Sequence, residues 1–341
     1  MDCTILIYTL DRPAYVARQV SYLKAVLPQY RVMVGDGSTG SFAAENAAAV
    51  QASGHSLAEY RPYPGVSPAP RLLNLLREVD TPLVVICADD DFLIPEGFLA
   101  SIEIMTKDRS LAVCQGASIG MPGPSENGMA HWGFNCKIGD IVCADPAERV
   151  AHHLNPYAHT FYGVHRTPSM LEIIGRISAP PFTLALGCTG ELAQSVLTAA
   201  SGGLRWLPIP YLCREPSLRR WPFELEVVHP DFSAAIDAVR SFLVERCTQP
   251  GQPANMLAGK LFDHSAANYF MRFVPGLESK QFDFWNWKSS RTPWNQDHSL
   301  DRMLHLLWSS SAWPMLLKHY PLAITESPKP SKKWGFGRLF K

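Results

Sequence analysis

The sequence predicts an α/β protein built on a doubly wound, mostly parallel β-sheet. Short apolar runs typical of buried strands alternate with segments whose apolar residues recur at helical spacing. Helices of this kind supply the crossover connections that parallel strands need. The chain has 341 residues, 47% of them hydrophobic, so it can bury the large core that such a sheet requires.

The first unit runs from a strand into a helix. Cys3–Thr9 (CTILIYT) is predicted to be a buried strand, and Pro13 follows at a position suited to the first turn of a helix. Val16, Val20 and Leu23 then recur at helical spacing. A strand followed at once by a helix begins the alternating pattern.

Three more strands are expected within the first 110 residues. Residues 31–34 form the second, which runs into the turn sequence at 35–38 (GDGS) before an alanine-rich helix. A short strand at 57–60 precedes a proline-rich loop and a helix. The fourth strand, 83–88 (LVVICA), ends at the acidic triplet 89–91. Because ligands bind beyond the carboxyl ends of strands in such sheets, one cleft should hold the polar residues found there.

The alternation loosens after residue 120 and becomes helical beyond residue 216. We therefore expect a sheet domain at 1–215, a helical C-terminal region at 216–326, and a basic, aromatic tail at 327–341. Further strands are expected at 159–166 and 204–213, and further helices at 191–200, 232–248, 255–273 and 299–309.

Charge and cysteine content exclude several classes of protein. Lysine plus arginine (31) balances aspartate plus glutamate (31), so no global field attracts nucleic acid. The eight cysteines form no CxxC pair and are predicted to be free thiols. The first residues lack the basic start of a signal peptide, and no apolar run approaches the roughly 20 residues that span a bilayer. We expect a cytoplasmic protein.

The acidic triplet is the strongest chemical signal. Three adjacent carboxylates at a strand end repel one another, and a divalent cation would relieve the repulsion. Magnesium and manganese bind carboxylate oxygens and keep positions open for substrate phosphates. A solvated turn that precedes the helix beginning near Pro95 would have the same sequence. Both interpretations stay open on the triplet alone.

Several spaced motifs in order make the chain similar to a known family. These are 8–13 (YTLDRP), 34–38 (VGDGS), Gly65 with Arg71 and Asn74, and 88–92 (ADDDF) followed by Pro95 and Gly97-Phe98. In this order they resemble the family 2 glycosyltransferases, over about 110 residues and more faintly to about residue 215. The resemblance implies a GT-A fold, a nucleotide-sugar donor and a divalent metal.

The same resemblance implies roles for individual residues. The nucleotide would contact Thr9, Asp11, Asp36, Arg71 and Asp89, with the Asp36 carboxylate accepting the N3 hydrogen of uracil. Asp91 would be the direct ligand of Mn²⁺ or Mg²⁺, supported by Asp89. Two positions depart from the family pattern: Gly35 stands where an aspartate is frequent, and Asp11 where asparagine is frequent.

In the second half, residues 187–192 (GCTGEL) resemble the segment that carries the acidic catalytic base, which would be Glu191. An acid in a first helical turn also simply favours the helix, so a structural role stays open. His229 or His165 could add a metal ligand, against the alternative of an ordinary structural histidine.

The leading hypothesis is an inverting glycosyltransferase that moves a sugar from a UDP-sugar to a hydroxyl of a glycan, lipid-linked or protein acceptor. One alternative is a sugar nucleotidyltransferase, although the segment after strand one lacks the glycines such enzymes use to bind phosphates. The other is a nucleotide-sugar-binding module without turnover. The tail at 327–341 interleaves basic and aromatic residues, which suits either peripheral membrane contact or a solvated terminus.

Overall fold

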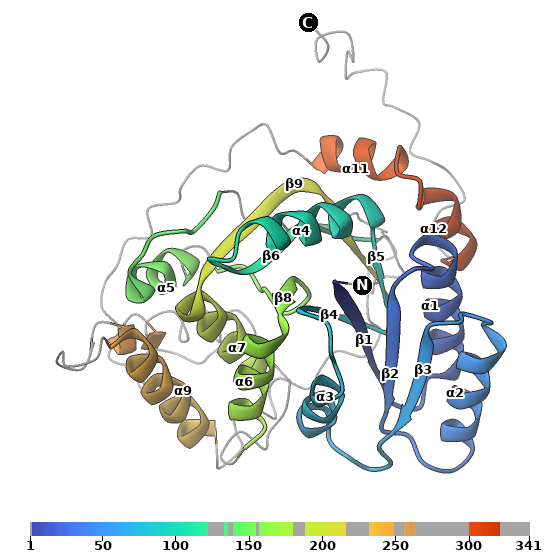
Figure 1. The fold of residues 1–341 in the computed structure, drawn as a ribbon, viewed down its shortest axis with the longest axis horizontal. Coiled ribbons are helices and arrows are strands. Elements are labelled where there is room, and N and C mark those ends of the chain that lie inside the picture. The colour runs from blue at the N-terminus through green and yellow to red at the C-terminus, as the bar shows by residue number, and fades with distance from the viewer. Residues whose placement is uncertain are drawn as a thin grey trace, which may run out of the picture.

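In the computed structural model the described residues form one sheet of nine strands with helices packed around it (Figure 1). The structure describes residues 2–121, 133–135, 139–154, 157–179, 188–215, 232–248, 256, 258–260, 262–263 and 300–320. The strands are β1 (Cys3–Thr9), β2 (Arg31–Asp36), β3 (Ala58–Pro62), β4 (Leu83–Ala88), β5 (Asp91–Leu93), β6 (Leu111–Gly120), β7 (Gly133–Asn135), β8 (Val164–Arg166) and β9 (Gly203–Arg214). The helices are α1 (Pro13–Val26), α2 (Gly40–Ala52), α3 (Pro68–Arg77), α4 (Pro95–Lys107), α5 (Pro146–Leu154), α6 (Thr167–Ile177), α7 (Cys188–Ser201), α9 (Phe232–Cys247), α11 (Leu300–Trp308) and α12 (Trp313–His319).

The first half of the sheet is parallel, as predicted. Strands β3, β2, β1 and β4 lie side by side in this order, and all three pairings are parallel. Because the chain reverses its direction across the sheet after β3, α1 and α2 lie on one face and α3 on the other (Figure 1). Prolines at the start of α1, α3 and α4 fix the backbone for a first helical turn.

The second half of the sheet is mixed, which the alternation of strands and helices did not reveal. Strand β8 runs antiparallel between β4 and β6, while β6 and β9 are parallel to each other with register shifts. The expected strand at 159–166 is reduced to β8 because the residues before it form a turn. The short strand β5 begins within the acidic triplet and pairs antiparallel with the end of β9.

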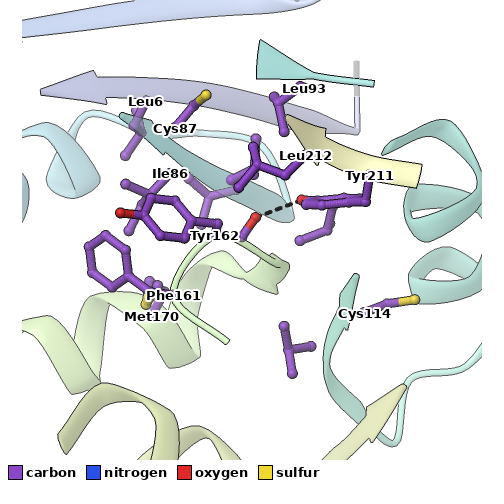
Figure 2. Packing of buried hydrophobic residues seen from close by; sticks show 14 of the residues in the cluster. Leu6, Ile86, Cys87, Leu93, Cys114, Phe161, Tyr162, Met170, Tyr211 and Leu212 are labelled. Atoms are coloured by element: carbon purple, nitrogen blue, oxygen red, sulfur yellow. Dashed lines mark hydrogen bonds between the residues drawn. The ribbon is translucent and has the colours of Figure 1, made fainter. Parts of the chain in front are cut away.

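A continuous apolar core joins the two halves. The central strands are almost completely buried, and the side chains of α1, α3, α4, α6 and α7 pack against them. Figure 2 shows part of this core, where the Tyr211 hydroxyl donates a hydrogen bond of 2.7 Å to the backbone carbonyl of Tyr162. At Gly97 a Cβ atom would lie 2.2 Å from the carbonyl oxygen of Pro210, so only glycine allows α4 to approach β9 this closely.

Two C-terminal helices pack on the sheet domain. Helix α11 contacts β9 and α12 contacts α1 (Figure 1). Glu96 in the first turn of α4 accepts hydrogen bonds from Ser310 and Ser311, which fixes the turn between the two helices. Helix α12 was not predicted, and of the helix expected at 255–273 the structure describes only six residues.

Six cysteines whose side chains the structure describes are free, as predicted: Cys3, Cys87, Cys114, Cys143, Cys213 and Cys247. Five of them are buried and Cys143 is half-buried. Within the described ranges, no helix is both long and apolar enough to cross a membrane.

Candidate nucleotide-binding site

The strand ends bring three predicted site residues to one edge of the sheet. Thr9 lies opposite Asp36 in the β1–β2 register, and Tyr8 lies opposite Ala88 in the β1–β4 register. Asp89 follows Ala88 directly, so it lies beside Thr9. This is the edge at which ligands bind in parallel α/β sheets.

Asp89 is held between a neutral and a charged donor. Its side chain is 4% exposed; Oδ2 accepts a hydrogen bond of 2.6 Å from the Thr9 hydroxyl, and Oδ1 lies 2.6 Å from a terminal nitrogen of Arg12. Burial raises the pKa of Asp89 to about 6, and Arg12 opposes that rise. Both carboxylate oxygens of Asp89 therefore already have close partners.

Arg12 joins the neighbouring acid as well. The same guanidinium donates two hydrogen bonds, of 3.0 and 3.1 Å, to Oδ2 of Asp90. It also stacks over the ring of Tyr15, with 3.7 Å between the guanidinium carbon and the ring centroid. One guanidinium from the loop after β1 thus pairs with two of the three acidic side chains.

Asp91 is the first residue of β5. The antiparallel register pairs it with Arg214 of β9, and Oδ2 lies 3.3 Å from Nε of Arg214. This oxygen is buried and accepts no hydrogen bond. Burial raises the pKa of Asp91 to about 7, since it outweighs the attraction of Arg214.

Asp36 is the centre of a hydrogen-bond network in the turn after β2. Oδ1 accepts from the backbone nitrogen and the hydroxyl of Ser38, and Oδ2 accepts from Asn46 (2.9 Å) and from the Tyr60 hydroxyl (2.7 Å). These four bonds use the acceptor capacity of a carboxylate. The predicted contact with uracil stays a prediction, and it requires one of these donors to give up its bond.

Arg71 lies behind the strand ends. Its side chain is buried, and one terminal nitrogen donates a hydrogen bond of 2.8 Å to the carbonyl oxygen of Thr9. A Cβ atom on Gly37 would lie 1.7 Å from this nitrogen, so the guanidinium packs directly against the Gly37 backbone. Burial lowers the pKa of Arg71. Its position supports the loops after β1 and β2, whereas the predicted contact with base or phosphate stays untested.

Asp11 adopts a left-handed backbone conformation, with φ of 56°, at the exposed tip of the same loop. Its backbone nitrogen donates to the Ser38 hydroxyl at 2.7 Å, which ties the β1 loop to the β2 loop. Aspartate and asparagine tolerate this conformation better than other side chains. The departure from asparagine noted in the sequence therefore preserves the backbone geometry.

Glu191 lies in the first turn of α7, as predicted. Asp91 is the main cause of the raised pKa of Arg214, and burial is the main cause of the raised pKa of Tyr162. The negative charge of Glu191 raises both pKa values further. Tyr162 in turn packs under Arg214, whose guanidinium carbon lies 4.8 Å from the ring centroid. Glu191 is therefore within electrostatic reach of the residues that surround Asp91.

The histidines divide between the described and the undescribed parts of the chain. His165 lies on β8, and its Nε2 lies 2.7 Å from the carbonyl oxygen of Thr160, which identifies it as a buried structural residue. This geometry fits the alternative of an ordinary structural histidine, and a metal role for His165 stays a prediction. His229 lies outside the described residues, so its role stays a prediction.

The acidic edge can be tested for its fit to a divalent cation. Across the ranges that the structure describes, no three His, Cys, Asp or Glu side chains gather as a metal-binding group. Asp91 offers the buried carboxylate oxygen Oδ2, which accepts no hydrogen bond and suits a hard cation if Arg214, 3.3 Å away, shares or releases it. Asp89 fits only if Arg12 releases it.

Three residues of this site were not identified from the sequence. Arg12 lies within the motif 8–13 but was assigned no role, although a cationic side chain close to a strand end can indicate a partner for acidic residues there. Arg214 and Tyr162 gave no such signal, because only the antiparallel pairing of β5 with β9 brings Arg214 opposite Asp91.

No protein-family model matches the chain, and no curated protein matches its sequence. Among solved structures the chain is similar to residues 1–349 of TarS from S. aureus, with a TM-score of 0.55 and 12% identity over 80% of this chain and 73% of that chain. The same protein in complex with UDP-GlcNAc has a TM-score of 0.54 and 12% identity, over 80% of this chain and 72% of that chain. Its complex with UDP has a TM-score of 0.52 and 14% identity, over 94% of this chain and 81% of that chain. This likeness confirms the predicted GT-A-like α/β fold.

Proposed function

We propose that this protein is an inverting glycosyltransferase that uses a nucleotide diphosphate sugar. The observation that carries the proposal is the acidic triplet at the carboxyl edge of the sheet, where the buried Oδ2 of Asp91 has the ion-pair contact with Arg214 but accepts no hydrogen bond. The GT-A-like fold supports it, since TarS was solved with UDP-GlcNAc and with UDP. On the same ground we propose a UDP-sugar as donor and membership of glycosyltransferase family 2.

The donor would lie along the loops after β1, β2 and β4. Thr9 and Asp11 line this edge. Asp36 accepts a hydrogen bond from Ser38, which in turn bonds the Asp11 backbone, and Arg71 donates to the carbonyl of Thr9. These contacts fix two loops against each other before any ligand binds. Binding to preorganised loops costs less conformational entropy than binding to mobile ones.

The acidic side chains would bind Mn²⁺ or Mg²⁺, with Asp91 as the direct ligand, Asp89 in support and His229 as a further candidate. The cation supplies charge neutralisation for the departing diphosphate. The chain adds cations of its own at the same place, because Arg12 and Arg214 lie against the triplet. These guanidiniums are suited to bidentate contacts with phosphate oxygens.

The acceptor would approach from the side of α7. Its hydroxyl attacks the anomeric carbon as the bond from that carbon to the diphosphate oxygen breaks, and the hydroxyl proton passes to the Glu191 carboxylate. The proposal is supported by the electrostatic proximity of Glu191 to Arg214 and Tyr162. The acids of the triplet would lie on the side of the departing diphosphate and bind the cation, so they would not be available to accept this proton.

The first experiment is a thermal-shift screen of UDP, GDP and CDP with and without Mn²⁺. A ligand that binds only the folded state raises the melting temperature, so a shift that requires both UDP and Mn²⁺ is expected. Absence of any nucleotide-dependent shift would reject the proposed function. Slow hydrolysis of UDP-sugars by the purified protein then distinguishes a transferase from a binding module.

The second experiment tests the base through Glu191→Gln. We expect turnover to fall by about 10²–10⁴ while UDP affinity is retained, because a general base acts on the acceptor and not on the donor. Glu148→Gln is the matched control, since Glu148 is also an acid in a first helical turn, at the start of α5. Retained turnover in Glu191→Gln would reject the role, and loss of both properties would indicate a structural residue.

A further inference from the structure

Arg12 occupies the carboxylates that a divalent cation would need. One terminal nitrogen of its guanidinium lies 2.6 Å from Oδ1 of Asp89 and 3.0 Å from Oδ2 of Asp90, and the other lies 3.1 Å from the same Asp90 oxygen. Each of these is a charge-assisted hydrogen bond, the stronger class of such bonds in proteins. A cation at Asp89 must compete with these bonds.

The guanidinium is held in place but remains accessible. The ring of Tyr15 stacks on it, and Asp11, with its left-handed backbone conformation, immediately precedes Arg12 in the chain. The Arg12 side chain is 29% exposed, whereas that of Asp89 is 4% exposed. The Arg12 side chain can therefore move into solvent without a change in the core, whereas the buried Asp89 side chain cannot.

The charges also oppose simultaneous occupancy. Asp89, Asp90 and Asp91 carry three negative charges when ionised, and Arg12 and Arg214 supply two positive ones. Addition of a divalent cation to this set changes the local net charge from negative to positive. Departure of Arg12 restores the balance, and a nucleotide diphosphate offers the displaced guanidinium new acidic oxygens.

We propose that Arg12 is an internal counter-ion that takes the place of the divalent cation at Asp89 and Asp90 in the ligand-free protein and must leave them before the cation binds. The inference rests on the proposed function, because it concerns the same acidic edge. Its consequence is that Mn²⁺ alone binds weakly, and that Mn²⁺ and nucleotide diphosphate strengthen each other's binding because the nucleotide stabilises Arg12 in its displaced position.

Calorimetric titration with MnCl₂ alone, without nucleotide, tests the inference in the full-length protein. Arg12→Met removes the competing charge and keeps much of the apolar stem, so Mn²⁺ should bind about tenfold more tightly or better than in the parent. The matched control is Arg31→Met. Arg31 also bonds an acidic side chain, Glu59, but at the opposite end of β2, so Mn²⁺ affinity should not change.

Folding of the variant is monitored at the same time. Arg12→Met should melt at a lower temperature than the parent in chelator, and Mn²⁺ should recover the loss because it replaces the missing positive charge. Arg12→Gln, which keeps a hydrogen-bond donor without the charge, provides a milder second variant and should also bind Mn²⁺ more tightly. Unchanged or weaker Mn²⁺ affinity in both variants, or no Mn²⁺ binding in any variant, overturns the inference.

A separate arm distinguishes this inference from the proposed function. UDP is titrated into the parent and Arg12→Met at saturating Mn²⁺ and in chelator. If the parent shows Mn²⁺-dependent UDP binding while the variants gain no affinity for Mn²⁺, the inference about Arg12 fails and the proposed function stands. If UDP binds to no variant, the proposed function fails, and the titrations with Mn²⁺ alone still decide the role of Arg12.

Discussion

Asp91→Asn should make the ligand-free protein progressively more stable than the parent as the pH rises. In the parent, burial raises the pKa of Asp91 to about 7 from an ordinary value of 3.8. The folded state therefore keeps a proton on Asp91 between these values, whereas the unfolded chain has lost it. Stability attributable to this group is present at low pH and is lost as the pH rises through about 7.

The magnitude follows from the shift. Each unit of pKa difference corresponds to about 1.4 kcal/mol, and Asp91 goes from protonated to half-ionised in the folded state between pH 5 and 7. The parent should therefore lose about 2 kcal/mol relative to the variant over this range, and roughly 0.4 kcal/mol more by pH 8. Asp89 and Asp90 raise the pKa of Asp91, and Arg214 lowers it. The attraction of Arg214 is already included in this pKa, so the ion pair that the variant loses makes no separate contribution to the pH dependence.

The assay is urea unfolding of parent and variant from pH 5 to 8 in chelator, with the free energy of unfolding extrapolated to water at each pH. Asp80→Asn is the control, because the Asp80 side chain is 84% exposed and its replacement should leave the pH dependence unchanged. A difference between Asp91→Asn and the parent that is constant with pH would refute the reasoning. A difference that favours the parent at higher pH would show that Arg214 outweighs burial.

Three further predictions concern the loops, the helix layer and the tail. Gly37→Ala should lower the free energy of unfolding by about 2–4 kcal/mol because its Cβ displaces a buried guanidinium, whereas Gly175→Ala, whose Cβ meets its nearest atom at 3.8 Å, should be neutral or stabilising in thermal melts. Arg149→Met should cost about 3 kcal/mol in chemical denaturation, since Arg149 donates to four backbone carbonyls that join the start of α5 to the end of α7. Full-length protein should bind anionic liposomes more strongly than a chain ending at Glu326, and equal sedimentation with the liposomes would rule out a membrane role for the tail.

The amino-acid sequence determined the elements whose signal is local. The strands β1 and β4 were predicted with their observed bounds, because a run of buried apolar residues ends at a clear polar signal in each. The same locality places Thr9, Asp36 and Asp89 at one edge, since each directly ends or follows a parallel strand. Residues that act through the position of their own strand end can be predicted without knowledge of distant contacts.

Only the tertiary structure decided how the charges of the site are paired. The sequence suggested that the acidic triplet needs a cation, yet it gave no reason to expect that Asp89 faces Arg12 while Asp91 faces Arg214. That division arises because β5 starts at Asp91 and pairs antiparallel with β9, which places Arg214 opposite Asp91. The turn network likewise uses both oxygens of Asp36, Oδ1 through Ser38 and Oδ2 through Asn46 and Tyr60. Hydrogen bonds and ion pairs depend on distances between segments far apart in the chain, and local propensity carries no information about those distances.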